Sequence, residues 1–148
     1  MCISQTAMPD FLLFPYVGAR PILFDMSVPD VERVVGPPVS VGTTYYGKRE
    51  EWRGPVSIRY SKFDQRVIDI AFLPQARLFY EGVDLFRKDD LIGFLSQYDQ
   101  PYESVGFVVF LTLGITVTGF HDNDESQKAI VAFKNGRMDE FRGDLTPL

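Results

Sequence analysis

The sequence predicts an α+β fold, in which two tandem strand-helix-β-meander units form a mostly antiparallel sheet with helices on one face. Segments that alternate apolar and polar residues outnumber helical ones, and short polar connections join them as hairpins. The elements also recur in the same order, at offsets of 59 to 61 residues. We therefore predict a single domain over residues 1–148, built from two repeats at about 20–75 and 76–141.

The first repeat begins with an apolar stretch, "PILFDM", which is followed by a predicted helix in "SVPDVERVVGPP", residues 27–38. Ser27 is a typical N-cap, Pro29 suits the first turn, and Gly36 with the two following prolines ends the helix. Three valines at positions i, i+3 and i+4 form one apolar stripe. Strands are then predicted at "VGTTYYG", "VSIRYS" and "VIDIAF".

The second repeat has the same order of elements. The strand-like "ARLFY" leads to a predicted helix in "RKDDLIGFLSQYDQP", residues 87–101, which has the same apolar spacing. Strands follow at "VGFVVF", "ITVTGF" and "KAIVAF". Several elements in register favour tandem duplication. The alternative is a single α+β domain whose helices and hairpins are spaced alike by coincidence.

Alternation along the strands separates a core face from a polar face. We expect the polar face to stay open to solvent and to offer a surface for a protein partner. In the two strands "VSIRYS" and "ITVTGF" the side chains expected on it are Ser57, Arg59, Ser61, Thr116, Thr118 and Phe120.

The net charge of −5 makes nucleic acid and anionic membranes unfavourable partners. Residues 1–75 hold eight basic and eight acidic residues, whereas residues 76–148 hold seven and twelve, which accounts for the whole −5. An acidic second half can attract a basic partner over about one Debye length, roughly 8–10 Å.

The single cysteine, Cys2, allows no internal disulfide and fits a reducing compartment. No secretory signal and no run of about 20 apolar residues is evident. We expect a soluble, cytoplasmic protein.

The segment "HDNDESQ" holds the only histidine, His121, beside Asp122, Asp124 and Glu125. Neighbouring residues cannot converge as zinc ligands, and the glycine and distal glutamate of a calcium loop are missing. We interpret the segment as a polar turn, with a weak cation site as the alternative. The sequence thus predicts no metal and no cofactor.

Catalytic motifs are also lacking in the sequence. No G-x-S-x-G elbow and no phosphate-binding glycine loop is present. Adjacent acids such as Asp89 and Asp90 fit the first turn of a helix, where negative charge is favourable. We therefore predict that the protein is not an enzyme.

Two groups of residues are candidates for partner binding. The first is the aromatic and arginine-rich loop "YYGKREEWRG", because Trp, Tyr and Arg dominate interface hot spots; its alternative role is cross-strand packing in the core. The second is an acidic and tyrosine-containing group, suited to a basic target or simply solvated. The candidates are Tyr45, Tyr46, Arg49, Trp52, Arg53, Asp89, Asp90, Asp99, Tyr102, Glu103, Asp122, Asp124 and Glu125.

The duplicated helix-and-meander unit resembles the fold of the beta-lactamase inhibitory protein and of small outer-membrane lipoproteins. The motif "LFDMSVPDV", residues 23–31, is similar to their strand-to-helix junction, with Asp25 where glycine is common. The second copy, "VDLFRKDDL", matches only by pattern. Small bacterial immunity proteins, which neutralise toxins of polymorphic or type VI secretion systems, are similar in being acidic, cytoplasmic and poor in cysteine.

These features predict a non-enzymatic protein-binding module, specifically an immunity protein, or antitoxin, that blocks a basic toxin or effector domain by occluding its surface or active site. One alternative is a small hydrolase or ligand-binding enzyme with a pocket between the two units. Another is a structural assembly factor that self-associates.

Overall fold

The structure, a computed structural model, describes residues 8–120, 125–138 and 143–148. One group of strands comprises β1 (Phe11–Phe14), β2 (Gly18–Arg20), β3 (Ile22–Leu23), β8 (Leu78–Tyr80) and β9 (Val83–Asp84). Another comprises β4 (Ser40–Thr43), β5 (Arg49–Arg53), β6 (Val56–Tyr60), β7 (Val67–Phe72), β10 (Pro101–Ser104), β11 (Phe107–Phe110), β12 (Ile115–Thr118), β13 (Ala129–Phe133) and β14 (Thr146–Pro147). The helices are α1 (Val28–Val35), α2 (Leu91–Leu95) and the 3-10 turn η1 (Glu125–Gln127).

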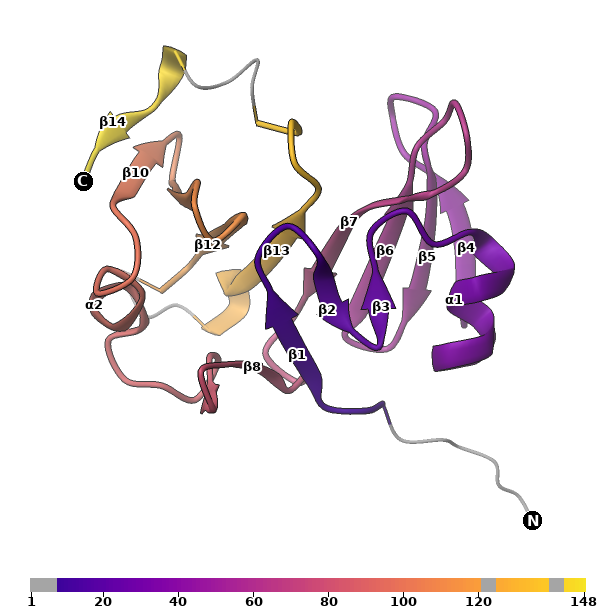
Figure 1. Cartoon of the computed structure of the whole chain (residues 1–148), viewed down its shortest axis with the longest axis horizontal. Helices are drawn as coiled ribbons and strands as arrows, with labels where there is room; N and C mark the ends of the chain where they lie inside the picture. Colours follow the sequence, from indigo (N-terminus) through magenta and orange to yellow (C-terminus); the bar gives the residue numbers. More distant parts are fainter. Residues whose placement is uncertain (1–7, 121–124, 139–142) are drawn as a thin grey trace.

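Within these residues the strands form two sheets (Figure 1). The small sheet has five strands in the order β3-β2-β1-β8-β9. The large sheet has nine, in the order β14-β10-β11-β12-β13-β7-β6-β5-β4. All pairings are antiparallel except that of β1 with β8. Figure 1 shows β1 to β3 in front of the large sheet, with α1 and α2 at opposite sides.

The predicted α+β class is wrong, because the protein is mostly β. The two α-helices hold only eight and five residues and form no layer over one face of the sheet. The core instead joins the small sheet to the large one, with one or two buried residues from each helix. Buried side chains from both sheets include Phe11, Ile22, Leu78, Ile58 and Phe110.

Helix α2 is shorter than the predicted segment 87–101, for a local reason. Asp90 adopts a left-handed conformation, with φ 50°, so the helix begins only after it. The Asp90 side chain accepts a hydrogen bond from the Gly93 amide and caps the first turn. Leu91 and Leu95, two residues of the predicted apolar stripe, are buried as expected.

Helix α1 agrees with the prediction at both ends. The Ser27 hydroxyl accepts a hydrogen bond from the Asp30 amide at 3.3 Å, and the Asp30 carboxylate accepts one from the Ser27 amide at 3.2 Å. This reciprocal pair is a capping box. Gly36 ends the helix with φ 82°. Val31 is fully buried, whereas Val34 is 41% exposed, so the apolar stripe is narrower than predicted.

The large sheet consists of two four-stranded meanders, β4 to β7 and β10 to β13, which are joined edge to edge by β7 and β13, and of β14, which pairs with β10. Across this seam Phe72 lies opposite Ile130, and Ile70 lies opposite Ala132. Each meander follows a two-stranded hairpin and a helix, in the same order along the chain. Common ancestry of the two halves stays a prediction.

The polar face of the large sheet is not open throughout, contrary to expectation. Val109 and Phe133 point to this face, yet they are only 1% and 3% exposed. The C-terminal segment, described at residues 134–138 and 143–148, returns to the sheet: the Lys134 amide bonds to the Ile68 carbonyl, and β14 pairs with β10. The sequence signal for this cover is weak, because the segment is mostly polar.

No helix in the part of the chain that the structure describes is long and apolar enough to cross a membrane.

Candidate functional site

A groove of about 960 Å³ lies between the polar face of the large sheet and the C-terminal segment. We call it the sheet groove. Both halves of the chain contribute to it, since β6 and β7 supply one wall and β10 to β13 supply the floor. Its lining residues are Arg59, Asp69, Glu103, Ser104, Val105, Phe107, Val109, Thr116, Val131, Phe133, Arg137, Met138, Asp144 and Thr146.

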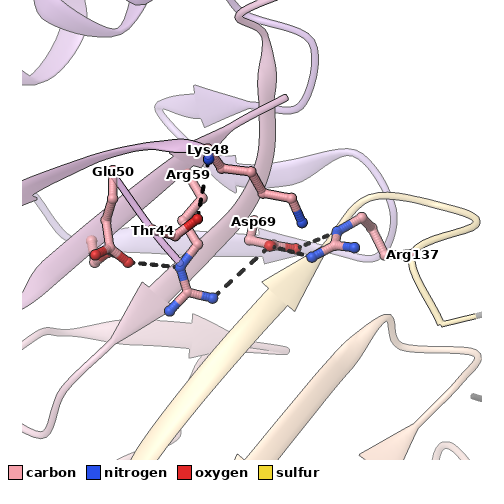
Figure 2. A network of polar contacts seen from close by, with 7 residues as sticks. Thr44, Lys48, Glu50, Arg59, Asp69 and Arg137 are labelled. Carbon is pink, nitrogen blue, oxygen red and sulfur yellow. Dashed lines mark hydrogen bonds and ion pairs between the residues drawn. The ribbon is translucent and has the colours of Figure 1, made fainter. Parts of the chain in front are cut away.

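A network of charged side chains, drawn in Figure 2, contributes Arg59, Asp69 and Arg137 to the lining of the sheet groove. Asp69 is 3% exposed and receives two bonds from Arg137, Nε to Oδ1 at 3.0 Å and Nη2 to Oδ2 at 2.7 Å. Arg59 Nη1 lies 4.0 Å from Asp69 Oδ2, and Arg59 Nε donates to Glu50 at 2.7 Å. Figure 2 also draws Lys48 beside these residues, so three basic side chains surround the two carboxylates.

This network fixes the C-terminal segment to the sheet. The bidentate geometry between Arg137 and Asp69 is the strongest form of such an ion pair. Asp69 is buried, so its charge requires a partner. The pair therefore sets the position of the groove wall that carries Arg137 and Met138.

A second charged cluster lies on the opposite, core-facing side of the same strands. Glu51 is fully buried and accepts hydrogen bonds from Arg53 and Tyr60, both at 2.8 Å, and from Arg49 at 2.7 and 2.9 Å. Arg53 is 3% exposed and also donates to the Gly36 carbonyl at 2.9 Å. Its Nη2 atom is buried without a hydrogen-bond partner.

The Glu51 cluster shifts two pKa values. Burial alone would raise the pKa of Glu51, but the hydrogen bonds from Arg53, Tyr60 and Arg49 outweigh burial and lower it. Burial raises the pKa of Tyr60, and its bond to the Glu51 carboxylate raises it further. Glu51 is thus ionised and Tyr60 neutral near pH 7. The cluster ties β5 and β6 to the end of α1.

Neither cluster has the composition of a metal centre. Among the described residues, no three of the His, Cys, Asp and Glu side chains lie together as metal ligands. His121, Asp122 and Asp124, which form the predicted polar turn, lie outside the described residues. Glu125 begins η1, and its side chain is not described.

Comparisons with models of known protein families, with curated proteins and with solved structures find no match for this chain. The resemblance to the beta-lactamase inhibitory protein therefore stays a prediction.

The aromatic part of the predicted partner-binding loop is at the surface. Tyr45 and Tyr46 form the turn between β4 and β5, which we call the aromatic turn. Their side chains are 95% and 73% exposed, and their rings meet edge to face at 5.2 Å. Tyr45 therefore does not pack in the core, which was the alternative interpretation. Trp52 is half-buried on the polar face, opposite Ser57.

The two arginines of that loop serve the fold. Arg49 and Arg53 both bind Glu51, and Arg53 is buried. Sequence reasoning placed Arg53 at a partner surface because arginine is common at interfaces. The alternation of β5 instead turns positions 51 and 53 inward, where each charge offsets the other.

The acidic and tyrosine-containing candidates divide between structural and exposed positions. The Asp99 carboxylate accepts bonds from the Thr112 and Leu113 amides at 2.7 and 3.0 Å, which fixes the turn after β11. Asp90 caps α2, and Asp89 beside it is exposed. Tyr102 and Glu103 lie on β10, and of the two only Glu103 lines the sheet groove.

The structure separates the two predicted groups. β4 is one edge of the large sheet, and β10 is next to the other edge. Seven strand spacings divide them, which amounts to roughly 33 Å. The aromatic turn and the acids near β10 therefore form separate surfaces.

Several groove residues were missed by sequence reasoning, above all Asp69 and Arg137. The available signal for Asp69 was a single acid within the apolar strand "VIDIAF". Such a residue needs a cation when it is buried. Nothing in the local sequence indicates that the cation comes from Arg137, 68 residues later.

Proposed function

We propose that this chain is a non-enzymatic protein-binding module, specifically an immunity protein that neutralises a bacterial toxin by occluding its surface or active site. The observation that carries the proposal is the aromatic turn beside an unprotected strand edge. Tyr45 and Tyr46 expose large rings at low entropic cost, which is typical of interface hot spots.

Strand β4 extends the same surface. All four of its residues are exposed, and no other described strand pairs with its outer edge. Val39 and Val41 are 83% and 50% exposed. Natural edge strands are usually protected by charges, prolines or bulges, whereas "SVGT" contains no charge and no proline. An edge of this kind supports the addition of a partner's strand.

The chemistry of the proposed partner follows from charge. The excess of acids in residues 76–148 favours the approach of a basic toxin or effector domain. The exposed carboxylates of Asp89 and Glu103 belong to a surface separate from the aromatic turn, so they support attraction of a basic partner and not direct contact at the β4 edge. We place this interaction in the cytoplasm, and the proposal includes neither nucleic acid nor membrane.

The aromatic turn provides the test. A toxin encoded beside this protein's gene is co-expressed with it, and relief of growth arrest is measured. Tyr45→Ala/Tyr46→Ala should reduce binding to the toxin by about tenfold or more, since each hot-spot residue contributes on the order of 1–2 kcal/mol. Its stability should change by less than about 0.5 kcal/mol, because both rings are exposed.

Val105→Ala is the control. Val105 is 92% exposed in the turn between β10 and β11, toward the opposite edge of the large sheet from β4. It should leave rescue intact. Absence of any neighbouring toxin whose growth arrest is relieved would contradict the proposal, as would equal effects of the two variants.

A second candidate function is that of a ligand-binding protein or small hydrolase with a pocket between the two units. The sheet groove favours it, because residues from both halves line one concavity in the size range of small-molecule sites. A structural assembly factor is a third candidate. It predicts self-association through β4 in light scattering, without rescue of growth.

A further inference from the structure

Strand β4 is an outer strand of the large sheet (Figure 1), so alternate backbone groups along it face away from β5. The Thr44 amide bonds to the Lys48 carbonyl at 2.8 Å, and the pairing of β4 with β5 continues from there without a shift in register. Because hydrogen-bonded pairs alternate along an antiparallel ladder, Gly42 directs its N–H and C=O groups toward β5. Val41 and Thr43 therefore direct theirs outward, and no other described strand pairs with them.

The outward groups of Val41 and Thr43 are complementary to a second copy of themselves. When two β4 strands lie antiparallel with Gly42 opposite Gly42, Val41 of each copy lies opposite Thr43 of the other. Both of these are hydrogen-bonded pairs, because the outward N–H and C=O groups of one copy meet those of the other. Four hydrogen bonds then cross the interface, and none of the outward groups of Val41 and Thr43 is left without a partner.

The side chains of this register are compatible with self-pairing. Val41 lies opposite Thr43 on one face, and Gly42 lies opposite Gly42 on the other, so no charged residue of one copy is directly opposite a charged residue of the second. The two charged residues that neighbour these positions on β5, Arg49 and Glu50, already form ion pairs within their own chain. Like charges directly opposite each other usually oppose edge-to-edge pairing, and this register has none.

Self-pairing also covers exposed apolar surface. Val39 and Val41 are 83% and 50% exposed, and Tyr45 is 95% exposed. The register that places Gly42 opposite Gly42 brings Val39 of one copy level with Tyr45 of the other, at both ends of the paired segment. Contacts between aromatic and β-branched side chains on adjacent strands stabilise sheets, and the contact removes apolar area from water.

We propose that the free chain forms a symmetric dimer in which β4 of one copy pairs antiparallel with β4 of the other, centred on Gly42. The two large sheets become one continuous sheet, and the twofold axis closes the assembly at this edge. The inference concerns the chain alone, so it does not rest on the proposed toxin. A toxin that adds a strand to β4 would compete with the second copy for the same edge.

Sedimentation equilibrium of the purified full chain tests the dimer. We expect a Kd on the order of 100 µM, because a contact of this size is in the range of small, transient interfaces. Gly42→Lys should weaken the dimer about tenfold or more, since it places two lysines directly opposite each other, with Cα atoms about 4.5 Å apart. A Cβ atom at Gly42 has no neighbouring atom within 4 Å, so the variant should fold. Val105→Lys, which adds the same charge at a 92% exposed position far from β4, should leave the dimer intact.

A pair of cysteine variants tests the register. In a Cys2→Ser background, Gly42→Cys should form an intermolecular disulfide with oxidised glutathione, because Cα atoms about 4.5 Å apart can be bridged. Ser40→Cys is the matched control, since Ser40 is exposed on the same face of β4. In the proposed register the two Ser40 residues lie roughly 13 Å apart along the strands, too far for a disulfide. Non-reducing electrophoresis measures the cross-linked fraction.

A chain that stays monomeric up to about 1 mM would overturn the proposal, because even a weak interface of this kind is populated at that concentration. A dimer that Gly42→Lys leaves unchanged would also overturn it, as would cross-linking of Ser40→Cys as fast as that of Gly42→Cys. None of these measurements involves a toxin or growth rescue. The failure of the dimer is therefore distinguishable from the failure of the proposed function.

Discussion

At the scale of residues, the Glu51 cluster explains why charged side chains sit inside strand β5. Glu51 and Arg53 occupy core-facing positions and are almost completely inaccessible. Burying either charge alone would strongly destabilise the fold. The pair is tolerated because Arg49 and Tyr60 donate further hydrogen bonds to the Glu51 carboxylate. The cluster is therefore sensitive to the loss of any one member.

Glu51→Gln should destabilise the protein by about 3–5 kcal/mol, because it leaves the Arg53 charge buried without a counter-ion. The measurement is the free energy of unfolding in urea. Glu50→Gln, on the next residue but on the polar face, should cost about 1 kcal/mol or less, since its partner Arg59 is a third exposed. A smaller loss for Glu51 than for Glu50 would refute this account.

The same cluster predicts a pH dependence. The pKa of Glu51 in the folded chain lies below its ordinary value of 4.5, so ionised Glu51 adds stability above pH 4.5. This contribution is lost as the pH falls through 4.5 toward the lower folded pKa. The difference in unfolding free energy between the wild type and Glu51→Gln should therefore shrink below pH 4.5. A difference that stays constant down to pH 3 would argue against the cluster.

Sequence reasoning had access to only part of this residue-level picture. The alternation in "VSIRYS" correctly assigns Ile58 and Tyr60 to the core and Arg59 to the other face. The same rule assigns Glu51 inward, but the local charge of "KREEWR" is more typical of an exposed turn. Whether Glu51 faces the core or the solvent depends on hydrogen bonds that involve Tyr60 and the Gly36 carbonyl. These two residues lie near Glu51 and Arg53 only in the folded chain.

At the scale of elements, the local sequence was sufficient to predict an element when all the residues that specify it lie within or next to that element. The helix α1 is specified by Ser27, Asp30 and Gly36, all of which act on the helix itself. The small sheet could not be foreseen in the same way. Strand β1 pairs with β8, and Phe11 lies opposite Leu78 across 67 residues of chain, so no local pattern reports the contact.

Ser27→Ala should destabilise the protein by about 1 kcal/mol, because it removes the acceptor for the Asp30 amide. Thermal or urea unfolding measures the loss. Ser27→Asp keeps an acceptor at this position and should recover most of the stability. If the aspartate variant were as unstable as the alanine variant, capping would not be the cause.

At the scale of the whole molecule, the seam between β7 and β13 makes the halves interdependent. Ile70, Phe72 and Ile130 are fully buried along this seam, and Ala132 is 1% exposed. Each half alone would expose an apolar inner strand as a new sheet edge. The small sheet adds a second link, because β1 and β8 come from different halves.

Residues 8–75 and 76–148, produced separately, should therefore each lack a sharp cooperative unfolding transition, since neither can bury enough apolar surface alone. Mixed at equal concentration, they should regain β-sheet circular dichroism and a cooperative transition. A half-length chain that unfolds cooperatively by itself would show that the seam is dispensable.

The sequence by itself determined three of the four strands of each meander, the position of α1, and the inward-facing residues of β6 and β12, because these follow from side-chain periodicity and from caps that act within a few residues. It did not predict β5, which lies in the segment interpreted as a loop, or β10, and it placed α2 only within residues 87–101. The tertiary structure alone decided that a second sheet rather than a helical layer covers the core, and that Arg137 meets Asp69 to wall the sheet groove. Those features depend on contacts between residues more than 60 positions apart, and the free energy of such contacts is set by burial and charge pairing that no local pattern encodes.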